Sequence, residues 1–114
     1  MDREELNDMC FGGANVPTYG WICPAISVGE TNFREYAGQT IQEMTDEMTK
    51  EGLTAKDYLL KGMEELGLGN DPATLKVAFS LAGTDEWFRT FGEYLQQSYK
   101  ATLGVNMEIS FNNW

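Results

Sequence analysis

The chain has 114 residues, 42% of them hydrophobic, and its 18 acidic against 8 basic residues give a formal net charge of -10. That is about one domain of sequence, and so acidic a surface repels nucleic-acid backbones and anionic lipid headgroups, which excludes both kinds of partner. Because the sequence has no histidine, nucleophilic systems and metal sites that depend on histidine are excluded too.

A short helix is predicted over residues 2–11, with Asp2 as its cap and Gly12 just beyond its end. The start of the chain has neither the basic residues nor the apolar stretch of a secretion signal. An acidic, capped helix in that position suggests a segment of a longer protein. No apolar run is long enough to cross a membrane.

Residues 12–39 are rich in glycine and proline, which excludes long regular elements. The same stretch is too apolar and too aromatic for a disordered linker. Two interpretations remain open: an ordered loop that wraps a small core, or a surface that contacts a ligand through Tyr19 and Trp21.

Cys10 and Cys23 are the only cysteines. Their spacing fits neither a CxxC redox pair nor a zinc site, which would need further Cys or His ligands. A disulfide between them would suit an extracellular protein, but two separate thiols are the simpler expectation.

Two helices are predicted within residues 40–68. Thr40 with Glu43, and then Thr54 with Asp57, have the spacing of a capping box, in which a hydroxyl and a carboxylate three residues on cap the helix start. The short link at Gly52 predicts a hairpin or a bend. The apolar stripes expected to be buried are Ile41, Met44 and Met48 on the first helix and Tyr58, Leu59, Met63 and Leu66 on the second.

Residues 74–114 predict a strand, a helix and a second strand. Apolar residues alternate over 74–81 and again over 105–111, as in strands with one buried face, and Gly104 can end the helix between them. A helix of that length returns the chain to its starting side, so the two strands should be parallel and adjacent. The aromatic stripe expected to cover the sheet includes Trp87, Phe88, Phe91 and Tyr94.

The sequence offers little for catalysis. Its many carboxylates fall on solvated helix faces, and nothing there separates the pKa values of a pair as an acid/base mechanism needs. The run GLGND at residues 67–71 follows a helix and precedes a strand, the reverse of a phosphate loop. We therefore expect a non-enzyme with no cofactor and no metal.

Three runs carry a resemblance to a known family: LLKGMEELGLG at residues 59–69, YKATLGVNMEISFNNW at 99–114, and FGGANVPTYGWICPAI at 11–26. Together they resemble the C-terminal lobe of the extracellular solute-binding proteins of peptide ABC transporters, the oligopeptide-binding family. The family has a corresponding helix end, strand, helix, and LGV strand that leads to an aromatic residue. Residues 39–52 depart from its pattern and look like an insertion.

The resemblance implies part of a periplasmic-binding-protein-like α/β lobe in a two-lobed receptor, secreted or lipid-anchored outside the membrane. That receptor would close over an extended peptide and deliver it to an ABC permease. The segment would then be one partial domain: a helix and loop (1–39), two helices (40–68) and the β-α-β unit (74–114).

The candidate ligand-binding residues are Trp114 and Asn113, because ligands of parallel sheets bind beyond the carboxyl ends of the strands. The family also has an aromatic residue at the place of Trp114. The alternative is an acidic α/β protein-interaction module without a ligand cleft, and an isolated carboxylate enzyme is a remote third. An isolated segment should also self-associate, through Tyr19, Trp21 or the outer strand edges.

Overall fold

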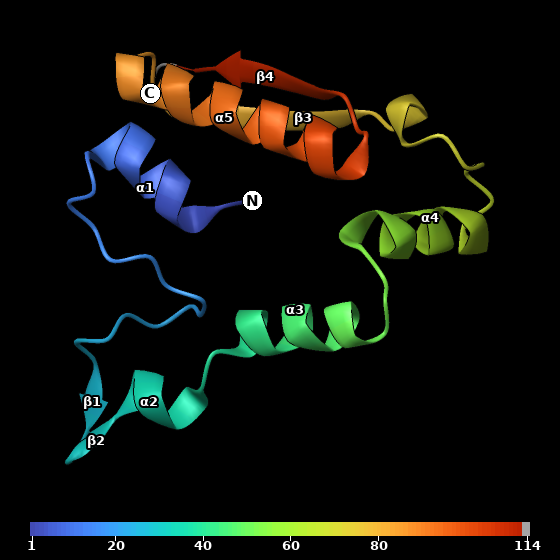
Figure 1. Ribbon diagram of the computed structural model, residues 1–114. Helices are drawn as coiled ribbons and strands as arrows, with labels where there is room; N and C mark the ends of the chain where they lie inside the picture. Colours follow the sequence, from blue (N-terminus) through green and yellow to red (C-terminus); the bar gives the residue numbers. More distant parts are fainter. Residues whose placement is uncertain (113–114) are drawn as a thin grey trace.

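The computed structural model describes residues 1–112, and Asn113 and Trp114 lie outside the described residues (Figure 1). The fold is a mixed α/β arrangement, as the sequence predicts. In chain order its elements are α1 (Arg3–Phe11), β1 (Ser27–Val28), β2 (Thr31–Asn32), α2 (Phe33–Ala37), α3 (Thr40–Lys50), α4 (Ala55–Glu65), a 3-10 turn η1 (Pro72–Thr74), β3 (Val77–Leu81), α5 (Glu86–Leu103) and β4 (Met107–Phe111).

The β-α-β unit is confirmed. β3 and β4 pair in parallel, with Val77 opposite Met107 and Leu81 opposite Phe111, and α5 ends at Gly104 in the left-handed conformation. The first strand begins later than predicted. Asp71 caps the turn η1, and Thr74 belongs to this turn and not to the strand.

The core lies between this sheet and two helices. Its buried apolar side chains are Met63 from α4, Leu81 from β3, Leu95 from α5, Val105 from the link between α5 and β4, and Met107 from β4. Gly92 lets α5 approach closely, because a Cβ there would come within 2.7 Å of Leu81 and 3.5 Å of Ile109.

The aromatic side chains of α5 pack against two elements, the sheet and α1, and not against the sheet alone. Phe91 faces the sheet, with its ring 6.4 Å from that of Phe79. Tyr94 instead turns to α1, where its hydroxyl donates to the Asp2 carbonyl and the Glu5 carboxylate at 2.9 Å each. The prediction that Trp87 is a core residue on the sheet is wrong: its side chain is 42% exposed and lies beside Phe11 of α1.

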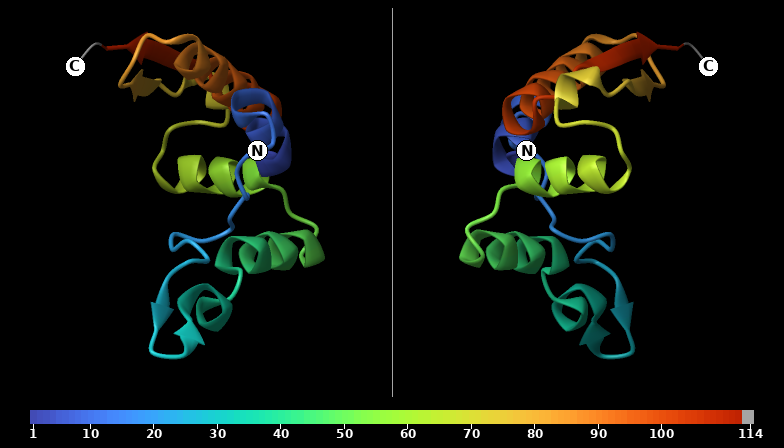
Figure 2. Two further views of the ribbon diagram at one scale, coloured as in Figure 1. Left: turned by 90° about the vertical axis from the view of Figure 1, so that its left-hand side faces the viewer. Right: turned by 90° about the vertical axis from the view of Figure 1, so that its right-hand side faces the viewer.

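Residues 12–39 do not wrap the core, so that interpretation is wrong. They run away from the β-α-β unit and form the two-residue strands β1 and β2, antiparallel to each other, followed by α2 (Figures 1 and 2). Several large apolar side chains of this stretch remain uncovered within residues 1–112. The most exposed are Trp21 (98%), Val16 (80%), Tyr36 (79%) and Val28 (69%).

One buried charge anchors this outlying part. Arg34 of α2 is 8% exposed, and its guanidinium donates to the Gly38 carbonyl. The guanidinium lies against Gly20, where a Cβ would meet it at 1.6 Å. Glycine at position 20 is therefore required by the packing of Arg34 and not by a turn.

Only one of the two predicted capping boxes forms. Thr54 and Asp57 cap α4 reciprocally, as predicted. The prediction for Thr40 is wrong, because the Glu43 amide donates to the Gln39 carbonyl and so starts α3 one residue earlier. Gln39 takes the cap position with no side-chain hydrogen bond.

The helices α3 and α4 are joined by a bend. They run the same way across Figure 1 but in opposite senses in the perpendicular views of Figure 2, so they cross at an angle. The buried stripe predicted for α4 is wrong at two positions. Tyr58 is 48% and Leu66 75% exposed, while Met63 is buried. α3 buries none of its residues.

The molecule as a whole is open. Its radius of gyration is 17.0 Å, whereas a compact chain of this length has about 13 Å. Its accessible surface is 8466 Å², roughly 2,200 Å² more than a compact monomer of this size exposes. The elements thus form a chain of small packed groups with one core, which the β-α-β unit and α4 build together.

Candidate ligand-binding surfaces

The carboxyl edge of the sheet is the first candidate surface. Because β3 and β4 are parallel, both strands end there, and the Asn112 amide ties the ends together by donating to the Leu81 carbonyl at 2.9 Å. The Arg89 guanidinium lies 5.2 Å above the Phe111 ring. Gly83, just beyond β3, lies so close to Phe88 that a Cβ would meet its ring at 2.1 Å.

Two of the predicted ligand-binding residues follow directly from this edge. Asn113 and Trp114 come after Asn112 in the chain, but both lie outside the described residues. The position of Asn112 at the carboxyl end of β4 agrees with the reasoning that singled them out. Their contact with a ligand stays a prediction.

The other two predicted residues lie elsewhere. Tyr19 is half-buried, with the Arg3 guanidinium 5.5 Å above its ring, and its carbonyl accepts a hydrogen bond from the Ile41 amide. Trp21 is 98% exposed. Their segment runs away from the strand ends in Figure 1, so the structure does not bring them together with the carboxyl edge.

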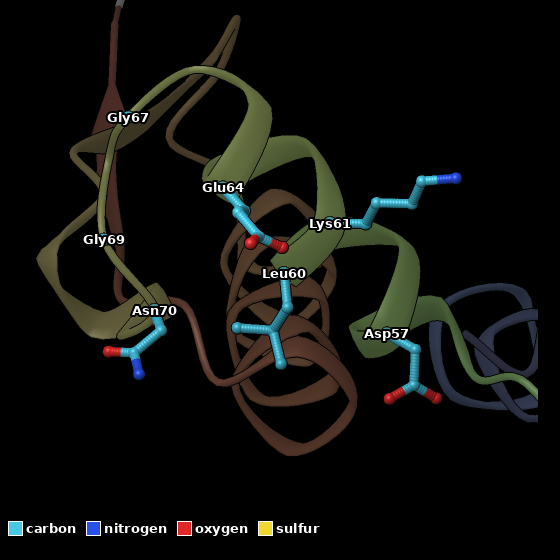
Figure 3. Close-up of a pocket in the computed structure, with 7 residues that line it drawn as sticks. All are labelled: Asp57, Leu60, Lys61, Glu64, Gly67, Gly69 and Asn70. Atoms are coloured by element: carbon cyan, nitrogen blue, oxygen red, sulfur yellow. The ribbon is translucent and has the colours of Figure 1, made fainter.

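A wide hollow of about 680 Å³ lies along α4 and the loop that follows it (Figure 3). The Leu60 side chain points into it, while the Lys61 ammonium group points away. The remaining lining residues are Asp57, Glu64, Gly67, Gly69 and Asn70. The lining has one apolar side chain, Leu60, and polar groups of different kinds. These polar groups do not converge on one point, as they would in a specific ligand site.

One carboxylate of this hollow, that of Asp57, caps a helix. Hydrogen bonds from the Thr54 side chain and amide hold the pKa of Asp57 below its ordinary value, and these bonds cap α4. Within residues 1–112, no group of three or more Cys, Asp and Glu side chains could hold a metal ion. The Asp57 carboxylate at this hollow thus serves to cap α4.

A second hollow, of about 590 Å³, lies between α3 and α4. Its apolar lining is Ile41, Met44, Met48, Ala55 and Tyr58, and its polar lining is Thr45, Glu47 and Glu51. We call this set of eight residues the α3–α4 groove. Sequence reasoning found the apolar stripe of α3 but took it for a buried face, since periodicity shows which residues share a face and not what covers it.

Inside this groove, the Tyr58 hydroxyl donates to the Glu51 carboxylate at 3.0 Å. This bond and the negative charges of Glu51 and Glu47 raise the pKa of Tyr58 above its ordinary value. The bond also fixes one carboxylate at the rim of the groove.

The two cysteines are not joined. Cys10 is partly buried, which raises the pKa of its thiol, and Cys23 is exposed. Both are free thiols in the structure, in line with the simpler of the two expectations. None of the helices within residues 1–112 is long and apolar enough to cross a membrane.

Over all 114 residues, the chain is 27% identical to the oligopeptide-binding protein OppA of Bacillus subtilis (strain 168). It spans only 19% of the length of that protein. No family profile matches the chain, and no solved structure matches it. The similarity indicates a distant relation to peptide-binding proteins.

Proposed function

We propose that these residues form part of the C-terminal lobe of an extracellular solute-binding protein that captures oligopeptides and delivers them to an ABC permease. The observation that carries this proposal is the similarity to OppA. It extends over the full chain and yet covers 19% of OppA, as expected for one piece of a lobe.

The open shape supports the same proposal. The chain exposes large apolar side chains such as Trp21 and Val16, which a self-contained domain would bury more fully. In a larger lobe, neighbouring parts of the receptor would cover this surface. Trp21 and Tyr19 then become contacts either to those parts or to the ligand.

In this receptor the carboxyl edge would form one wall of the peptide cleft. Trp114 and Asn113 follow the end of β4 at that edge, where ligands of parallel sheets bind. The aromatic ring would pack against a peptide side chain, and the amide would bond to the peptide backbone. Binding of this kind needs neither a cofactor nor a chemical step, so the protein is proposed to be a receptor and not an enzyme.

The receptor would work outside the cell, secreted or held by a lipid anchor, with the permease as its partner in the membrane. The acidic surface of these 114 residues, with a formal net charge of -10, would keep this part of the receptor away from anionic lipid headgroups.

The intact receptor that contains these residues provides the test. We would titrate it and its Trp114→Ala variant with a mixed peptide library by calorimetry. Removing a buried aromatic at an interface commonly costs at least about 2 kcal/mol, which is roughly a 30-fold loss of affinity. Unchanged affinity in the variant would remove Trp114 from the site, and an intact protein that binds no peptide would reject the function.

The alternative function, an acidic interaction module without a ligand cleft, is favoured by a different observation. The α3–α4 groove is apolar, acidic at its rim and open, and it lies on helices outside the β-α-β unit. It suits a protein partner better than a small ligand.

A further inference from the structure

The α3–α4 groove is an apolar surface that the described chain leaves uncovered. Ile41, Met44 and Met48 follow one another at helical spacing along α3, so they form one stripe. Met44 is 64% exposed, and Tyr58 across the groove is 48% exposed. Since α3 buries no residue, its apolar stripe does not contribute to the core described here.

The charge of the groove has one sign. Glu47 and Glu51 both line it, and the Tyr58 hydroxyl holds the Glu51 carboxylate in place. Its lining includes no basic residue. Two basic residues are adjacent to it in sequence, and both are directed elsewhere. Lys50 falls about 200° around the helix from Met48, on the opposite face, and the Lys56 ammonium group lies beside Gly104.

We propose that the α3–α4 groove binds a basic amphipathic helix of another protein. The apolar face of that helix would lie on the stripe of α3 and against Tyr58, and its flanking Lys or Arg side chains would pair with Glu47 and Glu51. Helix-in-groove recognition uses this combination of an apolar floor and charged rim. The two methionines are flexible and polarizable, so the groove would accept a range of apolar side chains.

A second copy of this chain is a poor occupant. Each copy has a formal net charge of -10, and its own amphipathic helices are acidic: the apolar stripe of α3 is flanked by Glu47 and Glu51, and α1 begins with Glu4 and Glu5 in its first turn. Placing either helix in an acidic groove would set like charges against each other.

The test uses a probe of the required chemistry. A fluorescently labelled peptide of about 18 residues, with Leu on one helical face and Lys on the other, is titrated with residues 1–114 and followed by anisotropy. We expect saturable binding that weakens as salt is added, because the charge pairs lie at the surface. A peptide with Glu in place of Lys should not bind.

Two variant pairs separate this groove from general attraction to an acidic protein. Glu47→Lys with Glu51→Lys should weaken binding at least about tenfold, whereas Glu93→Lys with Glu108→Lys, an equal charge change on the β-α-β unit, should alter it less than about twofold. Met44→Gln with Met48→Gln should weaken binding by a similar factor, and exposed Met9→Gln should leave it unchanged.

Three results would overturn the proposal. Equal losses in the two charge variants would show non-specific attraction, and the absence of saturable binding would leave the groove without this partner. Loss of peptide binding as the chain dimerises would assign the groove to a second copy. Circular dichroism of every variant would show whether a loss of binding reflects unfolding. If the charge or methionine variants unfold, Tyr58→Ala provides the test, because it changes no charge on either helix. It should weaken binding about tenfold.

Discussion

Two glycines within helices, Gly92 of α5 and Gly62 of α4, have different surroundings. At Gly92 the missing side chain allows close packing, since a Cβ would come within 2.7 Å of Leu81, which is itself buried. At Gly62, in α4, a Cβ would meet nothing within 4 Å. Close packing therefore requires glycine at position 92. At position 62 glycine makes no packing contribution and only increases the backbone entropy of the unfolded chain.

We therefore expect alanine to act in opposite directions at these sites. Gly62→Ala should raise the free energy of unfolding by about 0.5–1 kcal/mol through helix propensity. Gly92→Ala gains the same but should lower the net stability by about 1 kcal/mol, because overpacking costs about 1–3 kcal/mol. Chemical denaturation of both variants would measure this, and stabilisation of both would mean that α5 does not lie close to β3.

At the scale of elements, the sequence predicts best where the signals of one segment agree. The alternation in β3 and β4, the helical stripe of α5 and Gly104 beyond it all favour one arrangement, and the structure has it. The sequence does not predict which element packs against an apolar stripe. Tyr94 and Phe91 share the helical pattern, but α1 competes with the sheet for Tyr94, and no local signal reveals that.

The capping motifs show the same limit. Thr40 and Thr54 have equivalent sequence contexts, and only Thr54 caps its helix. The difference comes from hydrogen bonding before the helix. The Ile41 amide donates to the Tyr19 carbonyl and the Glu43 amide to Gln39, so tertiary and backbone contacts fix where α3 begins.

Replacing the two threonines tests this difference. Thr54→Ala should destabilise α4 by about 1 kcal/mol, as the loss of a cap commonly does. Thr40→Ala should have an effect close to zero, because Thr40 makes no cap bond. Hydrogen exchange of the two helices would report each effect, and equal losses at both sites would contradict the assigned caps.

The same cap makes α4 sensitive to acid. The pKa of Asp57 in the folded protein is held below its ordinary value of 3.8 by Thr54, so its contribution to stability is present above that pH. It is lost as the pH falls below 3.8 and the carboxylate takes up a proton. Circular dichroism during acid titration should show this loss in the natural protein and less of it in Thr54→Ala.

On the scale of the whole molecule, the sequence could not predict the open shape. Periodicity identifies apolar faces that are expected to be buried, such as the one that includes Tyr58. It does not show whether the residues that cover such a face belong to the same segment. Trp114 and Asn113 remain predictions for a related reason: the strand end that leads to them is described, and they themselves are not.

The open shape implies a tendency to associate. Both outer edges of the two-stranded sheet are unpaired by other strands within residues 1–112, and exposed edges can pair with another chain. The net charge of -10 opposes this at low salt. Sedimentation should therefore show association that grows as salt screens the repulsion, and a monomer at high protein concentration and high salt would contradict the expectation.

The most direct test of the proposed function is to measure peptide binding by residues 1–114 alone beside the intact receptor. One wall of a cleft buries too little of a flexible peptide to offset the cost of ordering it. We titrate both with a mixed library of short peptides that lack the basic amphipathic pattern proposed for the α3–α4 groove. We expect calorimetry to show no affinity of these peptides for residues 1–114 and clear affinity for the intact receptor. Tight binding of these peptides by residues 1–114 alone would contradict the account of a partial lobe.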